Sequence, residues 1–205
     1  MNPEFHDLIP LSKNKQIKGT RSIVREKVIQ ILTAHEISET PIEIIFQHIF
    51  YRDFNFGEGE GDSNGFNDGS NINTNRTLTP EEVFELEADI PIIWENNEAE
   101  FARRLIEKTL EIKDKIENYI AEVVTNWDYE RITLIDKLLI LVASAELLHF
   151  PEIPPKVSIN EALDISKVYS TDKSWLFING VLDSIYNKYC GDGEIVKTGR
   201  GLREK

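Results

Sequence analysis

The sequence predicts an all-α fold, a helical bundle of about six or seven helices that carries a disordered acidic insert. One observation is a run of apolar residues at helical spacing from Phe101 to Val123. A second is the segment from Leu134 to Phe150, which is apolar almost all round, as expected of the central helix of a bundle. No alternation of apolar and polar residues typical of a strand competes with these patterns.

The domain organisation follows from how composition changes along the 205 residues. We expect one helical domain over residues 20–190, with added segments at both ends and inside it. Residues 1–19 lack periodicity and predict a mobile basic arm, and residues 191–205 predict a mobile basic tail. Residues 57–76 are rich in Gly, Asn and acidic side chains and almost free of apolar ones, which predicts a disordered insert.

The formal net charge is −13, but most of the acidity lies in one part of the chain. Residues 53–100 carry one basic and 13 acidic side chains, whereas residues 1–52 carry 7 basic and 6 acidic ones. Between Leu11 and Lys27 the only acidic residue is Glu26, beside six basic ones. A basic patch that could contact a nucleic acid is therefore predicted at the N-terminal end.

Two helices are predicted in the N-terminal part of the domain. The first begins at Thr20 and ends near Ser38. Its predicted buried residues are Val24, Val28, Ile31, Leu32 and His35. The second has Thr40 as its N-cap and Pro41 at its first helical position, and it reaches about Tyr51. Its predicted buried residues are Ile44, Ile45, His48 and Ile49.

Capping signals predict where the middle helices begin. Thr79 and the residues after it restart helical structure, and Asn97 caps the long helix that reaches Val123. Thr133 and Asp136 form a capping box, in which each side chain satisfies a backbone donor of the helix start. The central apolar helix follows this box.

The last two helices are predicted from a second capping box and a polar turn. Ser158 and Glu161 predict a helix that opens near Ile159. Its predicted buried stripe is Ala162, Ile165 and Tyr169. Residues 170–172 supply cap chemistry for a final, largely buried helix. Gly180 within that helix predicts close approach of a neighbouring helix, because glycine is otherwise unfavourable there.

Three groups of residues carry a resemblance to a known family. The first group reads P-x-K-V-x-I-N-E-A, then S-x-x-F-I-N-G-V-L-D, and begins at Pro154 and at Ser174. The second group is Val24, Arg25, Glu26, Val28, Gln30 and Leu32, preceded by Arg21. The third group is Trp127, Arg131, Asp136, Glu146 and Leu147. In these positions the chain resembles the NusB family of bacterial transcription antitermination proteins, whose domain also occurs at the front of certain ribosomal RNA methyltransferases.

The resemblance implies a function and a set of partners. It implies a non-enzymatic factor that binds boxA-type single-stranded RNA together with NusE, a small-subunit ribosomal protein. The complex then supports read-through of ribosomal RNA operons by RNA polymerase, as part of the antitermination complex. Two alternatives stay open, namely a protein-interaction adaptor that has lost RNA binding and an RNA-binding accessory domain of a ribosomal RNA methyltransferase system.

The predicted RNA-binding residues combine cations with aromatic side chains, because single-stranded RNA is held by phosphate contacts and base stacking. They are Arg21, Arg25, Lys173, Trp175 and Phe177. For Trp175, base stacking and core burial are both open, and for Phe177 core packing is the main alternative. The first helix and the head of the last helix are thus expected to form one site.

The predicted partner-binding residues follow from the resemblance by position. They are Asp136, Glu146, Pro155 and Lys156. For Asp136 the alternative is that it only caps its own helix. The pattern contains no catalytic constellation and no ligand spacing for a metal, so no cofactor is expected. The single cysteine and the lack of a long apolar run predict a cytoplasmic protein without membrane contact.

Overall fold

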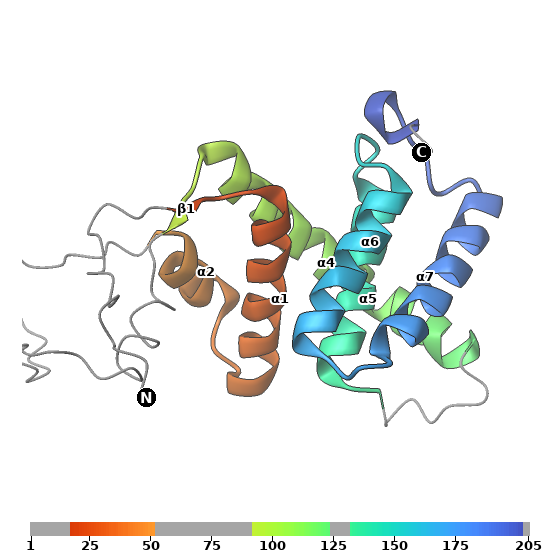
Figure 1. Cartoon of the computed structure of the whole chain (residues 1–205), viewed down its shortest axis with the longest axis horizontal. Coiled ribbons are helices and arrows are strands. Elements are labelled where there is room, and N and C mark those ends of the chain that lie inside the picture. The colour runs from red at the N-terminus through yellow and green to blue at the C-terminus, as the bar shows by residue number, and fades with distance from the viewer. Residues whose placement is uncertain (1–16, 52–91, 124–131, 203–205) are drawn as a thin grey trace, which may run out of the picture. The chain divides into compact units, whose positions relative to one another are not determined.

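The structure of the chain is a computed structural model, which describes residues 17–51, 92–123 and 132–202 (Figure 1). The chain divides into two units. Of the unit formed by residues 1–18 and 52–93, the structure describes a short parallel strand pair, β1 (Ile17–Lys18) and β2 (Ile92–Ile93). The insert 57–76, the helix predicted after Thr79, Trp127 and Arg131 all lie outside the described residues.

The second unit, residues 19–51 and 94–205, contains all the helices described. The α-helices are α1 (Arg21–Ser38), α2 (Ile42–Phe50), α4 (Asn96–Val123), α5 (Leu134–His149), α6 (Pro155–Tyr169) and α7 (Ser174–Gly191). A short 3-10 helix, η2 (Gly199–Leu202), follows them. The all-α prediction is confirmed. Within the described ranges no helix has the length and apolar character to cross a membrane.

Helix α5 forms the centre of this unit, as its sequence predicts. Residues 138–147 of α5 are all buried, and α1, α4, α6 and α7 pack around it (Figure 1). The hydroxyl of Ser144 donates to the Ile140 carbonyl at 2.6 Å, so this polar group is satisfied inside the helix. A helix that is apolar on every side is stable only where neighbours cover it completely.

Threonine side chains cap the starts of α1 and α5, and at α5 this confirms the threonine half of the predicted capping box. Thr20 Oγ1 accepts a hydrogen bond from the Ile23 amide, and Thr133 Oγ1 accepts one from the Asp136 amide. The predicted face of α4 is also buried from Phe101 to Ile120. Only its last member differs, because Val123 at the end of the helix is exposed.

The buried face of α2 differs from the prediction. Ile44 and His48 are exposed, while Phe46 and Phe50 are buried. The two rings stack with centroids 4.6 Å apart, and Phe50 also packs against Trp94. Aromatic rings bury more area than isoleucines do, so their packing sets the rotation of this short helix.

Helix α6 begins one turn before the predicted capping box. Pro154 and Pro155 start it, since proline at the first helical position has a suitable φ and lacks only an N–H that would be unpaired. Ser158 therefore lies inside the helix. The face buried against α5 consists of small residues, Ser158, Ala162 and Ser166. Tyr169 is not part of it, because 39% of its surface is exposed.

Gly180 does not lie at a close helix contact. A Cβ placed on Gly180 meets nothing within 4 Å of it in the described part of the chain. Glycine costs roughly 0.8–1 kcal/mol relative to alanine inside a helix. Replacing Gly180 by Ala is therefore expected to raise the free energy of unfolding by about that amount in urea denaturation.

Gly201 provides the control for this substitution. A Cβ on Gly201 would collide with the backbone carbonyl of Pro151, so Gly201→Ala should destabilise the protein. A Gly180→Ala variant that is less stable than the parent would contradict the open surroundings of Gly180.

Candidate nucleic-acid interface

A pocket lies where the first turn of α1 meets the start of α4, the turn between α5 and α6, and η2. Its volume is about 540 Å³. The residues that line it are Arg21, Ser22, Arg25, Phe101, Glu152, Ile153, Pro154, Val157, Glu161 and Arg200. Three of these are arginines, Arg21 and Arg25 from the first two turns of α1 and Arg200 from η2, and four others are apolar. We refer to these ten residues as the arginine pocket.

Arg25, which lines the arginine pocket, belongs to a buried ion pair between α1 and α5. Arg25 Nε lies 3.0 and 3.2 Å from the two carboxylate oxygens of Glu146, and Nη2 lies 2.6 Å from Oε1. Arg25 is 5% exposed and Glu146 is 1% exposed. Glu161 of α6 adds a second carboxylate 3.5 Å from Arg25 Nη1, and it accepts a hydrogen bond from Ser22. Arg25 and Glu146, predicted to contact RNA and a protein partner, are therefore partners of each other.

Arg21 has a different environment from Arg25. Its guanidinium carbon lies 4.1 Å from the centroid of the Phe101 ring, which is a cation–π contact. In the part of the chain that the structure describes, Arg21 has no ion pair with a carboxylate. Partial burial lowers the pKa of Arg21, against attraction by Glu98, but an arginine stays protonated near neutral pH. The positive charge of Arg21 is held in place and remains open to an anion.

The C-terminal segment, residues 192–202, returns to the arginine pocket rather than forming the expected mobile tail. Gly193 has a φ of 73°, which lets the chain turn after α7. Lys197 Nζ then donates to the carbonyls of Glu146 and Phe150 at the end of α5, and burial of this ammonium lowers the pKa of Lys197. The Thr198 amide donates to the Pro151 carbonyl at 2.9 Å. These contacts place Arg200 at the pocket.

The head of α7 carries the other predicted RNA-binding residues. Lys173 is exposed at the N-cap position, and Trp175 is 38% exposed. Phe177 is half-buried and packs against the core, which agrees with the alternative given for it. Of the three predicted residues, Lys173 and Trp175 are thus the exposed ones.

Asp136 lies beneath this turn and is 5% exposed. Its carboxylate accepts hydrogen bonds from Ser170 Oγ at 2.7 Å and from Ser174 Oγ at 3.0 Å. The acid therefore holds the turn between α6 and α7 as well as standing in the first turn of its own helix. A partner protein could not touch it directly in this conformation.

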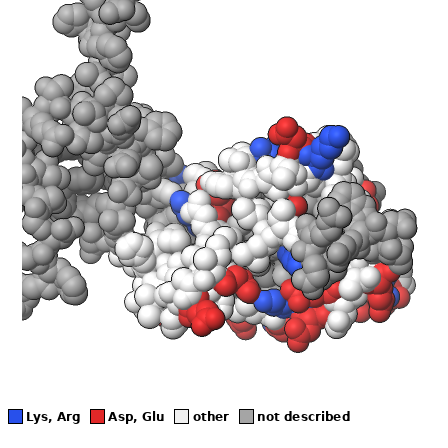
Figure 2. Space-filling model, turned by 90° about the horizontal axis from the view of Figure 1, so that it is seen from below, with Lys and Arg blue, Asp and Glu red and all other residues white. Residues whose placement is uncertain are grey.

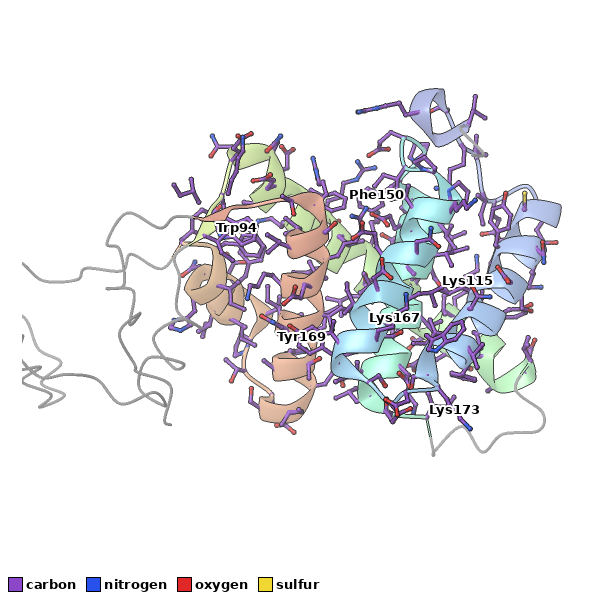
Figure 3. All side chains as sticks on the ribbon, viewed as in Figure 1. Trp94, Lys115, Phe150, Lys167, Tyr169 and Lys173 are labelled. Atoms are coloured by element: carbon purple, nitrogen blue, oxygen red, sulfur yellow. The ribbon has the colours of Figure 1, made fainter. Side chains whose placement is uncertain are left out.

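The two groups of predicted RNA-binding residues lie at opposite ends of the bundle. Helices α1 and α6 run in parallel, because Ser22 contacts Glu161 while Glu26 contacts Tyr169. Eight residues of helix from Glu161 to Tyr169 rise about 12 Å. In Figure 3, Phe150, next to the arginine pocket, lies at one end, Tyr169 lies between α1 and α6, and Lys173 lies at the other end. Arg21 and Lys173 therefore cannot contact the same phosphate.

The face seen in Figure 2, which looks at the molecule from below, carries no continuous basic patch among the described residues. Blue side chains occur singly between white and red ones. An anion held on this face would meet isolated cations. Non-electrostatic contacts, such as base stacking on Trp175, would therefore have to contribute to binding.

Sequence reasoning identified Arg21 and Arg25 and missed the other residues of the pocket, Phe101, Glu152 and Arg200 among them. The sequence did contain a signal for the ion pair of Arg25 and Glu146. Glu146 is an acid within an apolar helix, and a buried acid must be paired. The sequence contains no comparable signal that Arg200 belongs to a site, because its neighbours Gly199 and Gly201 predict a flexible tail.

Comparisons with known proteins complete the description of the site. The NusB family model matches residues 70–187. The transcription antitermination protein NusB of Chloroherpeton thalassium is 45% identical over 103 residues, which cover 50% of this chain and 49% of that relative. The chain thus spans about half the length of that relative. The NusB protein of Salinibacter ruber is 41% identical over 113 residues, which cover 55% of this chain and 71% of the relative.

Solved structures share the fold. NusB of T. maritima superposes on this chain with a TM-score of 0.58 at 25% identity. The match covers 84% of this chain and 94% of that chain. NusB in a crystal structure of the antitermination factors NusB and NusE in complex with dsRNA gives a TM-score of 0.54 at 18% identity. This second match covers 82% of this chain and 97% of the other, and it bears on the fold alone.

Proposed function

Because the chain belongs to the NusB family, we propose that it is a transcription antitermination factor that binds boxA-type single-stranded RNA together with NusE. In that role it supports read-through of ribosomal RNA operons by RNA polymerase. The observation that carries the RNA-binding part is Arg21, whose guanidinium is oriented by Phe101 and has no carboxylate partner in the described ranges. A fixed cation that has no paired carboxylate suits a backbone phosphate.

The proposed RNA path follows the seam between α1 and α6, defined by Ser22, Glu26, Gln30, Glu161 and Tyr169. The two acids of the seam are engaged, since Glu161 accepts from Ser22 and lies near Arg25, and Glu26 accepts from Tyr169. Of the two, Glu161 has its charge partly offset by Arg25. The seam leads from Arg21 to the turn that carries Lys173 and Trp175, so a strand of several nucleotides could reach both ends.

The proposed NusE contact uses the exposed start of α6. Lys156 is exposed and Pro155 is half-buried beside Pro154 and Val157 of the arginine pocket. Glu146 and Asp136 act indirectly in this proposal. Glu146 fixes Arg25 beneath the pocket, and Asp136 fixes the turn before α7.

A salt titration tests the RNA-binding part. The affinity for labelled boxA RNA and for a scrambled RNA would be measured by fluorescence anisotropy at several salt concentrations, with and without NusE. Each neutralised phosphate of a single strand contributes about −0.7 to the log–log slope. Arg21→Ala and Lys173→Ala should each flatten the slope by roughly 0.7, whereas Trp175→Ala should weaken binding by about 1–3 kcal/mol at an unchanged slope.

Arg103→Ala is the matched control, because it also removes one cation. Arg103 is half exposed and pairs with Glu43 of α2 at 2.7 Å, away from the seam. This variant should bind RNA nearly as the parent does. If the parent shows no affinity for boxA RNA but still binds NusE, the RNA-binding proposal is wrong and the adaptor alternative holds.

A further inference from the structure

The C-terminal segment, residues 192–202, lies after the residues that the family model matches, which end at 187. Nothing in the family match therefore assigns it a role. The segment nevertheless packs against the helical unit through several independent contacts, and it is the part of the chain that brings the third arginine to the arginine pocket.

The segment is attached partly through two backbone carbonyls at the end of α5, each of which also accepts a hydrogen bond from a backbone amide. Lys197 Nζ lies 3.0 Å from the Phe150 carbonyl and 3.3 Å from the Glu146 carbonyl, both at the C-terminal end of α5. A cation at this position interacts favourably with the negative end of the helix dipole. Glu146 thus supports the pocket twice, with its carboxylate on Arg25 and its carbonyl on Lys197.

Close packing fixes the residues on both sides of Arg200. The Thr198 amide donates to the Pro151 carbonyl, and the Gly201 amide donates to the Thr198 carbonyl. Gly201 is buried against Pro151 so tightly that a Cβ would collide with its carbonyl oxygen. Ile195 is buried as well, and Glu194 pairs with Lys115 of α4. Arg200 is therefore presented on an ordered support, which lowers the entropy lost when it binds a ligand.

Arg200 and Arg21 are two cations that line the same pocket, which also has apolar lining residues. Within the described ranges Arg200 has no carboxylate partner, and the same holds for Arg21. The apolar lining includes Ile153, Pro154 and Val157, and the acids Glu152 and Glu161 line the pocket as well. Two guanidinium groups in a pocket with apolar lining residues suit a nucleotide, whose phosphates are anionic and whose base and ribose present apolar faces.

We infer that the C-terminal segment is part of the RNA interface and that Arg200 contacts a backbone phosphate of the same RNA strand as Arg21. The inference rests on the proposed RNA binding and adds to it a residue outside the family match. Lys197 does not contact RNA in this account, because both of its close acceptors are carbonyls of α5. Its role is to position Arg200.

The test compares four variants and one control variant with the full-length parent on boxA RNA across a salt series. Arg200→Ala should bind about fivefold more weakly and flatten the log–log slope by roughly 0.7, with an unchanged melting temperature. Arg200→Lys should keep the slope of the parent, because it keeps the charge. Lys197→Met should weaken RNA binding as Arg200→Ala does. The double variant that carries both substitutions should have an affinity no lower than that of the weaker-binding single variant. Arg103→Ala serves again as the control for loss of one positive charge.

The outcomes separate this inference from the proposed function. If the parent binds boxA RNA and Arg200→Ala retains its affinity and slope, Arg200 is not an RNA contact, and the proposed function stands. If Arg200→Ala and Arg103→Ala weaken binding equally, the effect is one of net charge and the inference fails. If the parent itself does not bind the RNA, the proposed function fails together with the inference.

Discussion

Replacing Glu146 by Ala is expected to lower the free energy of unfolding by about 3–5 kcal/mol, the range found when one partner of a buried ion pair is removed. The substitution leaves the guanidinium of Arg25 buried with only Glu161 near it, at 3.5 Å and at the edge of the pocket. Because Arg25 is 5% exposed, water cannot replace the lost carboxylate without rearrangement. Urea denaturation followed by circular dichroism measures the loss.

A double variant makes this prediction specific to the pair. Replacing Arg25 by Met and Glu146 by Leu together removes both charges and should restore most of the stability, since apolar pairs often replace buried ion pairs at little cost. If Glu146→Ala costs less than about 1 kcal/mol, the ion pair is not buried as the structure shows it.

Replacing Asp136 by Ala has the second largest expected effect, a loss of about 2–3 kcal/mol. The carboxylate accepts hydrogen bonds from Ser170 and Ser174, and hydrogen bonds to charged groups contribute about 1.5–3 kcal/mol. Both hydroxyls lie in or beside the turn between α6 and α7, so the turn that carries Lys173 should also loosen. Thermal and urea unfolding measure the stability.

Two further variants show whether the effect comes from these hydrogen bonds. Asp136→Asn keeps one carbonyl acceptor and should cost less than Asp136→Ala. Asp172→Asn changes an exposed acid of the same turn and should leave stability within about 0.5 kcal/mol of the parent. Equal losses for Asp136→Ala and Asp172→Asn would mean that Asp136 does not hold the turn. A weaker NusE affinity of Asp136→Asn, measured separately, stays a prediction of the family resemblance.

Local signals in the sequence were sufficient for the starts of α1 and α5. Thr20 and Thr133 each precede a helical apolar pattern, and a threonine cap acts on backbone donors within its own turn. Where two local signals competed, the prediction was wrong. The Ser158 and Glu161 pattern suggested a helix start, but two prolines one turn earlier already provided it.

The rotation of a helix about its axis depends on what covers it, and this information is not local. In α2 the spacing of isoleucines predicted one face, whereas stacking of Phe46, Phe50 and Trp94 selects another. Arg25 lies off the predicted apolar face of α1, and this position predicted a cation on the surface. It is buried because Glu146 of α5 and Glu161 of α6 meet there, residues more than 120 positions away.

The candidate site was predictable in its residue types and not in its arrangement. Arg21 and Lys173 were both identified as cations, but only the parallel packing of α1 and α6 shows that they lie at opposite ends of a seam. Residues 192–202 looked like a mobile tail because the carbonyls that hold Lys197 and Thr198 belong to the end of α5 and the turn after it. Such contacts depend on the assembled fold.

Photo-crosslinking tests most directly the central claim that single-stranded RNA lies along the seam from Arg21 to Trp175. The full-length protein would be bound to boxA RNA that carries 4-thiouridine at one position at a time, irradiated, and mapped by mass spectrometry. We expect crosslinks near one end of the RNA to fall on residues 20–26 and those near the other end on residues 173–177. Crosslinks confined to α2 or to the Arg103 side of α4 would contradict the claim.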